Sequence, residues 1–219
     1  MPNKITAIIP AYNEEKTIAD VIMAAKSSDL LDEVIVVSDG SKDKTAERAR
    51  RAGAKVFELV PNRGKGGAMA YAVSQTKAEI ILFLDADLKG LTPAHIKKLV
   101  MPVLAGEKMM NVGIRDRGKF FSWLPKHLPL IGGERALSRF VFDRTPEKYR
   151  QGFMVEIALN YYCRSRHLPY GTVFLPGLGI RRKMQKVGIL KGSLGYIKMS
   201  WQVAKALIIV RWGRIIRKF

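Results

Sequence analysis

The chain has 219 residues, of which 47% are hydrophobic and 26% are charged, and its formal net charge is +19. This length fits one folded domain with an appendage. A single cysteine, Cys163, excludes an internal disulfide, and no apolar run approaches the roughly eighteen residues of a membrane-spanning helix. The first residues carry too short an apolar stretch for a signal peptide, so we expect a cytoplasmic protein.

The first half of the chain alternates short apolar runs with helical patterns, the last of them a helix that begins at Thr92-Pro93. The predicted strands are 5–9, 34–37, 55–59 and 80–84, and the predicted helices are 14–25, 43–52, a segment ending near 76, and 92–104. Strands that alternate with helices of this length predict an α/β fold with a mostly parallel sheet covered on both faces. Ligands of such sheets bind at the carboxyl ends of the strands.

The second half of the chain is less regular. Residues 109–115 are predicted as a further strand, and residues 153–163 as a helix. Residues 119–131 combine aromatic residues and prolines with few charges. This segment is either a buried connector or a segment that faces an apolar substrate or a membrane.

Positive charge is concentrated at the carboxyl end. Glu156 is the last acidic residue, and thirteen lysines and arginines follow it. Residues 196–218 predict a basic amphipathic helix. Such a tail favours an anionic surface, either lipid headgroups or nucleic acid. The alternative is an ordinary helix that packs on the core and leaves its basic face in water.

Two acids interrupt the fourth predicted strand. The apolar run 80–84 ends at Asp85, and Asp87 follows two residues later. Side chains two residues apart share one face of an extended chain, so we expect the two carboxylates to point the same way. Two hard oxygen ligands there suit Mg²⁺ or Mn²⁺ that carries phosphate oxygens. The alternative is a solvated turn.

Polar segments also follow the first two predicted strands, at residues 10–15 and 38–43. Asn13 alone could cap a helix, and Asp39 with the glycine after it could form a turn. Together the two segments place Glu14 and Asp39 beside one crevice. An acid at the end of the second strand can accept hydrogen bonds from a nucleobase or a ribose hydroxyl.

The third predicted strand is followed by a glycine-rich segment, residues 61–68. Glycines at a helix start let backbone N–H groups approach an anion, and the helix dipole adds to this attraction. Lys65 supplies a positive charge for a diphosphate. The alternative is a surface turn with a solvated lysine.

Several charged residues of the second half are candidates as well. Arg115 ends the fifth predicted strand, and Arg135 follows a glycine turn. Glu156 interrupts an apolar helix, where an unpaired acid would be costly to bury, so it is either a salt-bridge partner or a functional residue. Arg181, in a cluster of three basic residues, either clamps a phosphate or belongs to the basic surface.

Taken in chain order, the motifs resemble those of family 2 glycosyltransferases. The resemblance covers roughly residues 4–185 and rests on five segments: 8–15, 39–45, 62–66, the DXD motif 85–87, and 132–136. It implies a GT-A fold (a Rossmann-like nucleotide-binding half included), a nucleotide-diphosphate sugar donor and a divalent metal, Mg²⁺ or Mn²⁺. By this likeness Asp39 would contact the base, Glu14 the nucleoside, and Asp85 and Asp87 the ribose or sugar and the metal.

The resemblance also divides the residues by role. We expect residues 1–115 to bind the donor, residues 116–185 to form the acceptor side of the same domain, and residues 186–219 to form the basic helical segment. The expected donor-binding residues are Pro10, Ala11, Tyr12, Glu14, Asp39, Lys65, Asp85, Arg115 and Arg181. The expected catalytic residues are Asp87, Arg135 and Glu156.

Two subgroups of the family compete. Dolichol-phosphate and bacterial polyprenyl-phosphate sugar transferases are similar over the first 100 residues, and they have phosphate-binding arginines near Arg115, Arg135 and Arg181. Glucosyl-3-phosphoglycerate synthases are similar around residues 84–88, 133–136 and 155–157. That second subgroup carries a metal-binding histidine shortly after the position of Arg181, where this chain has Lys183 or nearby residues instead.

We therefore expect sugar transfer to a lipid-phosphate acceptor, with the protein bound peripherally to the inner face of the membrane. A phosphate acceptor is already an anion and needs no strong base, whereas a hydroxyl acceptor would require Glu156 as the base. A nucleotidyltransferase is disfavoured because no glycine- and arginine-rich loop follows the first strand. A non-catalytic membrane-binding module remains an alternative, and the strand-end acids Asp39, Asp85 and Asp87 argue against nucleic acid. The oligomeric state stays open.

Overall fold

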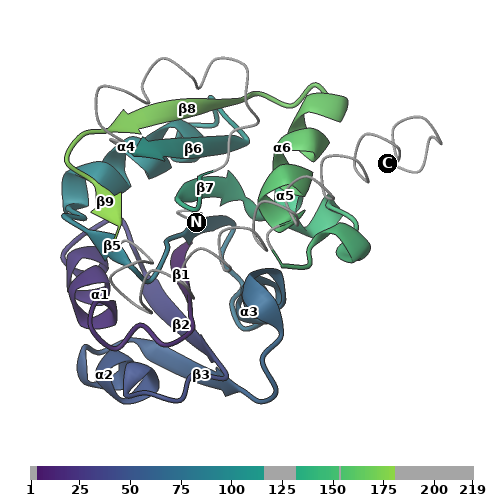
Figure 1. Ribbon diagram of the computed structural model, residues 1–219. Helices are drawn as coiled ribbons and strands as arrows, with labels where there is room; N and C mark the ends of the chain where they lie inside the picture. Colours follow the sequence, from purple (N-terminus) through teal and green to yellow (C-terminus); the bar gives the residue numbers. More distant parts are fainter. Residues whose placement is uncertain (1–3, 116–131, 153, 181–219) are drawn as a thin grey trace, which may run out of the picture.

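The computed structural model describes residues 4–115, 132–152 and 154–180. Seven strands form one hydrogen-bonded sheet in the order β3-β2-β1-β4-β7-β6-β8 (Figure 1). These strands are β1 (Ile5–Ala11), β2 (Glu33–Asp39), β3 (Lys55–Leu59), β4 (Ile80–Phe83), β6 (Met110–Arg115), β7 (Arg135–Ser138) and β8 (Tyr170–Leu175). Two short strands, β5 (Leu88–Lys89) and β9 (Gly179–Ile180), pair separately.

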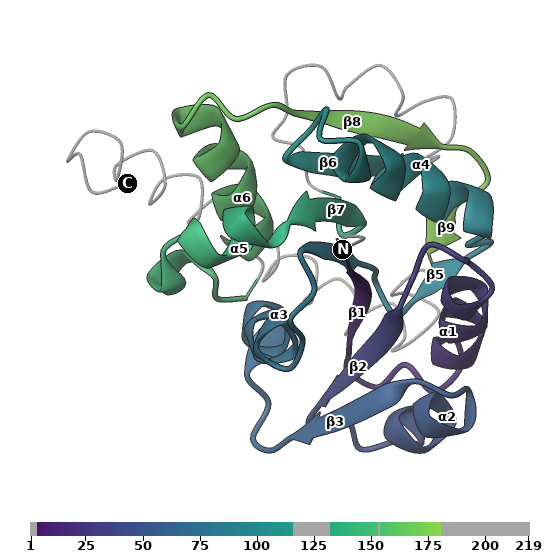
Figure 2. The same cartoon turned by 180° about the vertical axis from the view of Figure 1, so that it is seen from behind.

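The sheet is mostly parallel, as predicted. Strand β1 pairs in parallel with β2 and β4, β2 with β3, and β6 with β8. Only β7 runs the other way among the seven, and it pairs antiparallel with both β4 and β6. Figures 1 and 2 show β3 and β8 at opposite edges of the sheet from either side. The predicted α/β fold is therefore confirmed.

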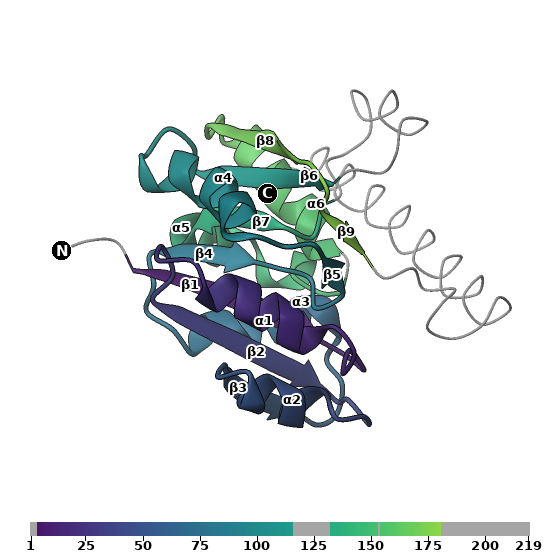
Figure 3. The same cartoon turned by 90° about the vertical axis from the view of Figure 1, so that its left-hand side faces the viewer.

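Helices cover both faces of the sheet (Figure 3). One face packs against α1 (Ile18–Lys26), α2 (Thr45–Arg51) and α4 (Pro93–Leu104). The other packs against α3 (Gly64–Ser74), α5 (Arg139–Arg144) and α6 (Met154–Ser165). A short 3₁₀ helix, η2, spans Glu147–Tyr149.

The strands supply these two cores alternately, since successive strand side chains point to opposite faces. In β4, Leu82 lies in the core beneath α1 and α4, whereas Ile81 and Phe83 lie in the core beneath α3, α5 and α6. Both faces of the strand are apolar because both are covered. The next residue in the phase of Phe83 is Asp85, which places its carboxylate on the side of α3 and α6.

Helix boundaries differ from the predicted ones mainly at the first helix. We expected it to begin near Glu14, but α1 begins at Ile18. Asn13 has a positive φ of 55°, and the carbonyl of Glu14 accepts hydrogen bonds from the amides of Thr17 and Ile18, so the intervening residues form a turn. By contrast, Thr92 caps α4 and Pro93 begins it, as predicted.

Four of the described strands were not predicted: β5, β7, β8 and β9. The predicted helix over residues 196–218, the segment 119–131 and Arg181 lie outside the described residues. Within the described ranges, the structure contains no helix with the length and apolar character needed to cross a bilayer.

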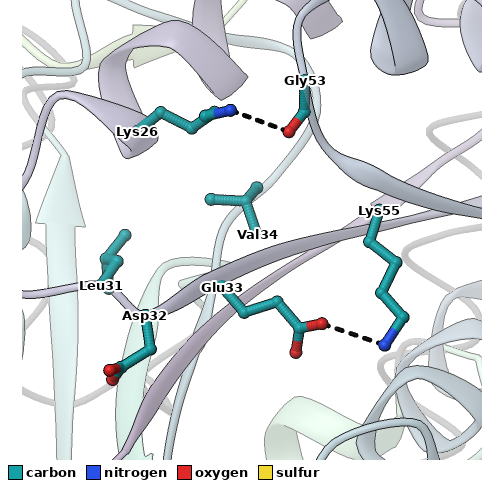
Figure 4. Close-up of a pocket in the computed structure, with 7 residues that line it drawn as sticks. All are labelled: Lys26, Leu31, Asp32, Glu33, Val34, Gly53 and Lys55. Carbon is teal, nitrogen blue, oxygen red and sulfur yellow. Dashed lines mark hydrogen bonds and ion pairs between the residues drawn. The ribbon is translucent and has the colours of Figure 1, made fainter.

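A hollow of about 260 Å³ lies at the amino ends of β2 and β3 (Figure 4). Its charged side chains are already engaged: Lys26 Nζ donates to the Gly53 carbonyl at 2.9 Å, and Lys55 pairs with Glu33 at 3.0 Å. The polar motifs singled out in the sequence lie at the carboxyl ends of the strands, so this hollow is not part of the candidate site.

Candidate active site

The loops after β1 and β2 are bonded to each other. The backbone amide of Asn13 donates to the hydroxyl of Ser41 at 3.1 Å, and Asn13 Oδ1 accepts from the amide of Lys42 at 2.8 Å. The amide of Glu14 donates to the hydroxyl of Thr45 at 2.8 Å. The first two polar motifs therefore hold each other in place at one edge of the sheet, as their positions predicted.

Asp39 joins the loop after β3 to the same edge. Its side chain is 3% exposed, and its Oδ1 accepts from the amide of Arg63 at 2.7 Å. Its carbonyl accepts from the side-chain amide of Asn62 at 2.6 Å. Asp39 thus fixes the turn that leads into α3, in addition to any contact with a ligand.

Lys65, in the first turn of α3, connects two carboxylates from distant parts of the chain. Its Nζ donates to Asp85 Oδ1 at 2.7 Å and to Glu156 Oε1 at 2.6 Å. The Lys65 side chain is 17% exposed, Asp85 is 20% and Glu156 only 5%. Lys65 is therefore not a solvated surface lysine: it links the end of β4 to the first turn of α6.

Asp85 and Asp87 lie on either side of a bend in the chain. Residues Ala86 and Asp87 form a turn, and the carbonyl of Ala86 accepts from the buried hydroxyl of Thr17 at 2.8 Å. The prediction that both carboxylates share one face of an extended chain is therefore wrong. The charges of both carboxylates contribute to raising the pKa of Arg115, so both act on the same guanidinium.

Gly133 gives the Asp85 carboxylate its space. A Cβ atom at Gly133 would lie 2.1 Å from Asp85 Oδ2 and 2.4 Å from both Cγ and Oδ1. No side chain other than hydrogen fits there without displacing the carboxylate. The glycine turn before β7 is thus built against the strand-end acid.

Arg115 and Glu134 extend the network on the other side of Asp85. Arg115 Nη1 lies 3.7 Å from Asp85 Oδ2, and its Nε lies 3.5 Å from Glu134 Oε2. Glu134 is completely buried. Burial opposes the charged form of Arg115, but Glu134 and then Asp85 outweigh it and raise the pKa of Arg115.

Arg135 is also completely buried. Its guanidinium donates to the carbonyl of Gly132 at 2.5 Å and to the carbonyl of Glu156 at 3.1 Å, and it lies 3.4 Å from Asn160 Oδ1. Its Nη2 is 3.7 Å from Glu156 Oε2. This burial favours a role in positioning Glu156 over the predicted contact with an acceptor phosphate.

Six charged groups of alternating sign therefore form one network, which we call the charge chain: Glu134, Arg115, Asp85, Lys65, Glu156 and Arg135. Burial lowers the pKa of Lys65, but Asp85 and Glu156 more than compensate and raise it above its ordinary value. Burial likewise opposes ionisation of Asp85, yet Lys65 and then Arg115 hold its pKa below the usual range. Asp85 and Lys65 are both charged at neutral pH.

Glu134 is the weak anion of the charge chain. Burial, followed by repulsion from Asp85, raises the pKa of Glu134 from 4.5 to about 7, against the attraction of Arg115 and Lys65. The folded protein therefore favours the neutral acid. The contribution of Glu134 to the free energy of unfolding is greatest below about pH 4.5. It is lost as the pH rises through 7, by roughly 3 kcal/mol in all.

Replacing Glu134 by glutamine is expected to flatten this pH dependence, since glutamine does not titrate. The measurement is urea unfolding of both proteins at pH 5 and pH 8. The wild type should lose more stability between these values than Glu134→Gln. The exposed Glu107→Gln serves as a control and should follow the wild type. Parallel pH dependences for all three proteins would contradict the assignment.

The remaining predicted residues are placed as follows. Tyr12 is 51% exposed and Ala11 is buried, both at the carboxyl end of β1 together with Pro10. Arg181 lies outside the described residues.

Asp85 and Asp87 offer the hard oxygens of a magnesium or manganese site, and Mg²⁺ commonly takes one or two carboxylates together with substrate phosphates. Among the described residues there is no group of three or more His, Cys, Asp or Glu side chains arranged for a metal.

Two features of the site were missed in the sequence. Glu134 was not singled out, although its place between a glycine turn and an arginine marked it as a charged residue next to a core strand. The loop before α6 also packs on α3: a Cβ at Gly66 would lie 1.9 Å from the carbonyl of Arg150. Gly66 is therefore required for packing, whereas the sequence pattern indicated only a role in anion binding for the glycines of this segment.

Comparison with known proteins places these features in a family. The model of Glycosyl transferase family 2 matches residues 6–163. Glucosyl-3-phosphoglycerate synthase of Mycobacterium tuberculosis is 39% identical over 190 residues, which cover 80% of this chain and 58% of the relative. An undecaprenyl-phosphate 4-deoxy-4-formamido-L-arabinose transferase of Pseudomonas paraeruginosa is 30% identical over 179 residues, covering 75% of this chain and 52% of the relative.

The fold is shared as well. A crystal structure of the Mycobacterium tuberculosis synthase with Mn²⁺, uridine diphosphate and phosphoglyceric acid superposes with a TM-score of 0.79 at 29% identity. The match covers 95% of this chain and 78% of that one. The chain spans little more than half the length of the two curated relatives. The resemblance seen in the ordered motifs is confirmed, and the chain belongs to glycosyl transferase family 2.

Proposed function

We propose that the protein transfers a sugar from a nucleotide-diphosphate donor to a phosphate-bearing acceptor, with Mg²⁺ or Mn²⁺ at Asp85 and Asp87. The observation that carries this proposal is the position of Asp85. It lies at the carboxyl end of β4, next to the loop after β1, and between α3 and α6. Ligands of parallel sheets bind at this edge.

The donor side is assigned to the residues after β1, β2 and β3. Tyr12 offers an exposed ring on which a base can stack, and Asp39 and Glu14 offer carboxylates for the nucleoside. When bound, the metal supplies electrostatic stabilisation of the charge that develops on the leaving diphosphate. Relatives support this assignment: the Mycobacterium tuberculosis synthase has been solved with Mn²⁺ and UDP-glucose, and with Mg²⁺ and uridine diphosphate.

Glu156 is assigned to the acceptor side. Its side chain is 5% exposed, and Lys65 and Arg135 hold its two carboxylate oxygens. For a hydroxyl acceptor, Glu156 would take the proton from the attacking oxygen. For a phosphate acceptor the attacking oxygen is already ionised, and Glu156 orients the site through its ion pairs.

Two kinds of phosphate-bearing acceptor are candidates. A lipid phosphate is favoured by the thirteen basic residues after Glu156, and the undecaprenyl-phosphate transferase is a relative. A small phosphorylated hydroxy acid is favoured by the synthases, one of which has been solved with phosphoglyceric acid. We place the lipid phosphate first because the acid-free tail suits an anionic membrane surface.

The experiment is turnover of radiolabelled nucleotide sugars with Mn²⁺ against a panel of acceptors. The panel includes undecaprenyl phosphate in vesicles, phosphoglyceric acid, and a neutral polyol as the control. Transfer to the lipid phosphate supports the first acceptor, and transfer to phosphoglyceric acid supports the second. If no nucleotide sugar is turned over with any acceptor of the panel, the proposed function is overturned.

We also propose that the protein lies on the inner face of the membrane. Deleting residues 196–219 is expected to release it from vesicles of phosphatidylglycerol and phosphatidylcholine, because each Lys or Arg near an anionic surface contributes about 1 kcal/mol. Cosedimentation measures the bound fraction, and vesicles of phosphatidylcholine alone are the control. If the truncated protein cosediments as well as the full chain, the tail is not the membrane contact.

A further inference from the structure

The Lys65 ammonium lies against Asp85, the acid proposed to bind the metal of a metal-bound diphosphate. Its ammonium is within 2.7 Å of both Asp85 and Glu156, and its side chain is mostly buried. A lysine that merely awaits a phosphate in solvent has no need of two carboxylates. In this arrangement the chain itself supplies a cation to the acid that is proposed to bind the metal.

Asp85 has a second cation as well. Arg115 lies 3.7 Å from its other oxygen, so the carboxylate is compensated from both sides. A divalent ion that approaches Asp85 alone would meet the like charge of Lys65 in a largely buried site, where such repulsion is weakly screened. The free protein is therefore expected to have a low affinity for a divalent ion that arrives without an anion.

A diphosphate changes this balance. It brings negative charge for both the metal and the Lys65 ammonium, and the long flexible stem of lysine lets that ammonium move between partners. Glu156 would not be left unpaired, because Arg135 holds its Oε2 and its carbonyl. Asp85 would then be free on the side that Lys65 now covers.

We propose that Lys65 is an exchangeable counter-ion: it closes Asp85 in the free protein and moves to the diphosphate when donor binds. This inference rests on the proposed function and adds a dependence between its two ligands. The metal binds weakly alone and tightly together with the nucleotide. By linkage, the nucleotide also gains affinity from the metal by the same factor.

The test measures Mn²⁺ binding to the full chain by electron paramagnetic resonance of the free ion, with and without uridine diphosphate. In the wild type we expect uridine diphosphate to tighten Mn²⁺ binding at least tenfold, within the usual range of coupling between sites. In Lys65→Met, Mn²⁺ alone should bind more tightly than in the wild type, by roughly tenfold. The gain from uridine diphosphate should be smaller.

The sign of the Lys65 effect separates this inference from a plain phosphate-binding lysine. A lysine that only contacts phosphate would leave the affinity for Mn²⁺ alone unchanged and weaken uridine diphosphate only. Lys97→Met, which removes an exposed lysine of α4, is the matched control for net charge and should behave as the wild type. Unchanged or weaker binding of Mn²⁺ alone to Lys65→Met overturns the inference.

Lys65→Gln covers the case in which Lys65→Met does not fold, as judged by circular dichroism. Glutamine keeps a hydrogen-bond donor for the carboxylates but carries no charge, so it should change Mn²⁺ binding in the same direction. Failure of the proposed function gives a different result. In that case neither Mn²⁺ nor uridine diphosphate binds the wild type, whereas independent binding of both contradicts only the role of Lys65.

Discussion

Replacing Asp85 by asparagine is expected to reduce kcat/KM for the nucleotide-sugar donor by about 10²–10³, even at saturating Mn²⁺. Asparagine keeps the shape of the side chain but removes the charge that a metal requires. It also leaves Lys65 and Arg115 facing each other with no anion between them. Metal stabilisation of a leaving group contributes several kcal/mol to the barrier, and each 1.36 kcal/mol is tenfold in rate.

The assay is release of the nucleoside diphosphate from the donor identified in the acceptor panel. Asp20→Asn is the control, because Asp20 is exposed on the first turn of α1, where its loss should leave turnover within twofold or so of the wild type. If Asp85→Asn retains a third or more of the wild-type kcat/KM, Asp85 is not the metal ligand.

Replacing Arg135 by methionine is expected to lower the free energy of unfolding by about 3–5 kcal/mol. Methionine fills similar space but removes the cation beside Glu156 Oε2, so that Lys65 alone has to compensate the buried carboxylate among the ion pairs described. It also removes the donor that the Gly132 carbonyl accepts from. Removing one member of a buried ion pair is costly because the other charge remains in a medium that solvates it poorly.

Urea unfolding measures the loss. Arg51→Met is the control: Arg51 is 78% exposed and pairs with Glu47 on the surface, so its loss should cost less than about 1 kcal/mol. The double variant Arg135→Met with Glu156→Met should recover part of the stability, because the under-compensated buried carboxylate is then absent while Lys65 keeps Asp85 as its partner. A loss below 1 kcal/mol for Arg135→Met would show that Glu156 does not depend on it.

The parallel part of the fold was predictable because local signals and tertiary packing agree there. Strands such as β4 are apolar on both faces, and each is followed by a polar loop and a helix with a clear start or end. Thr92 and Pro93 marked the beginning of α4 within a residue. The strand-end positions of Asp39 and Asp85 followed from the same pattern.

The antiparallel insertion was not predictable in this way. Strand β7 is four residues long, Arg135–Ser138, and begins with a charged residue that no strand pattern favours. Its place between β4 and β6 is set by pairing with residues distant in the chain: Ser138 pairs with Ile80, more than fifty positions away, and Leu137 pairs with Met110, more than twenty positions away. The burial of Arg135 has the same origin, since only the assembled sheet and α6 enclose it.

The site was predicted as a set of residues but not as a network. The strand-end pattern placed Lys65 and Asp85 at the same end of the sheet, and family likeness added Glu156, but the sequence could not show that a lysine bridges the two acids. That bridge depends on the packing of Gly66 against Arg150, which brings α3 close to α6. Spacing along the chain carries no signal for such a contact.

The insertion of β7 also decides how the enzyme can move. Strands β4, β7 and β6 are joined by backbone hydrogen bonds, so the proposed donor side and the proposed acceptor side share one continuous sheet. A hinge between them would have to break that ladder. Rigid-body closure of two lobes around the substrates is therefore not available within the described residues, and any gating must come from side-chain rearrangement or from loops.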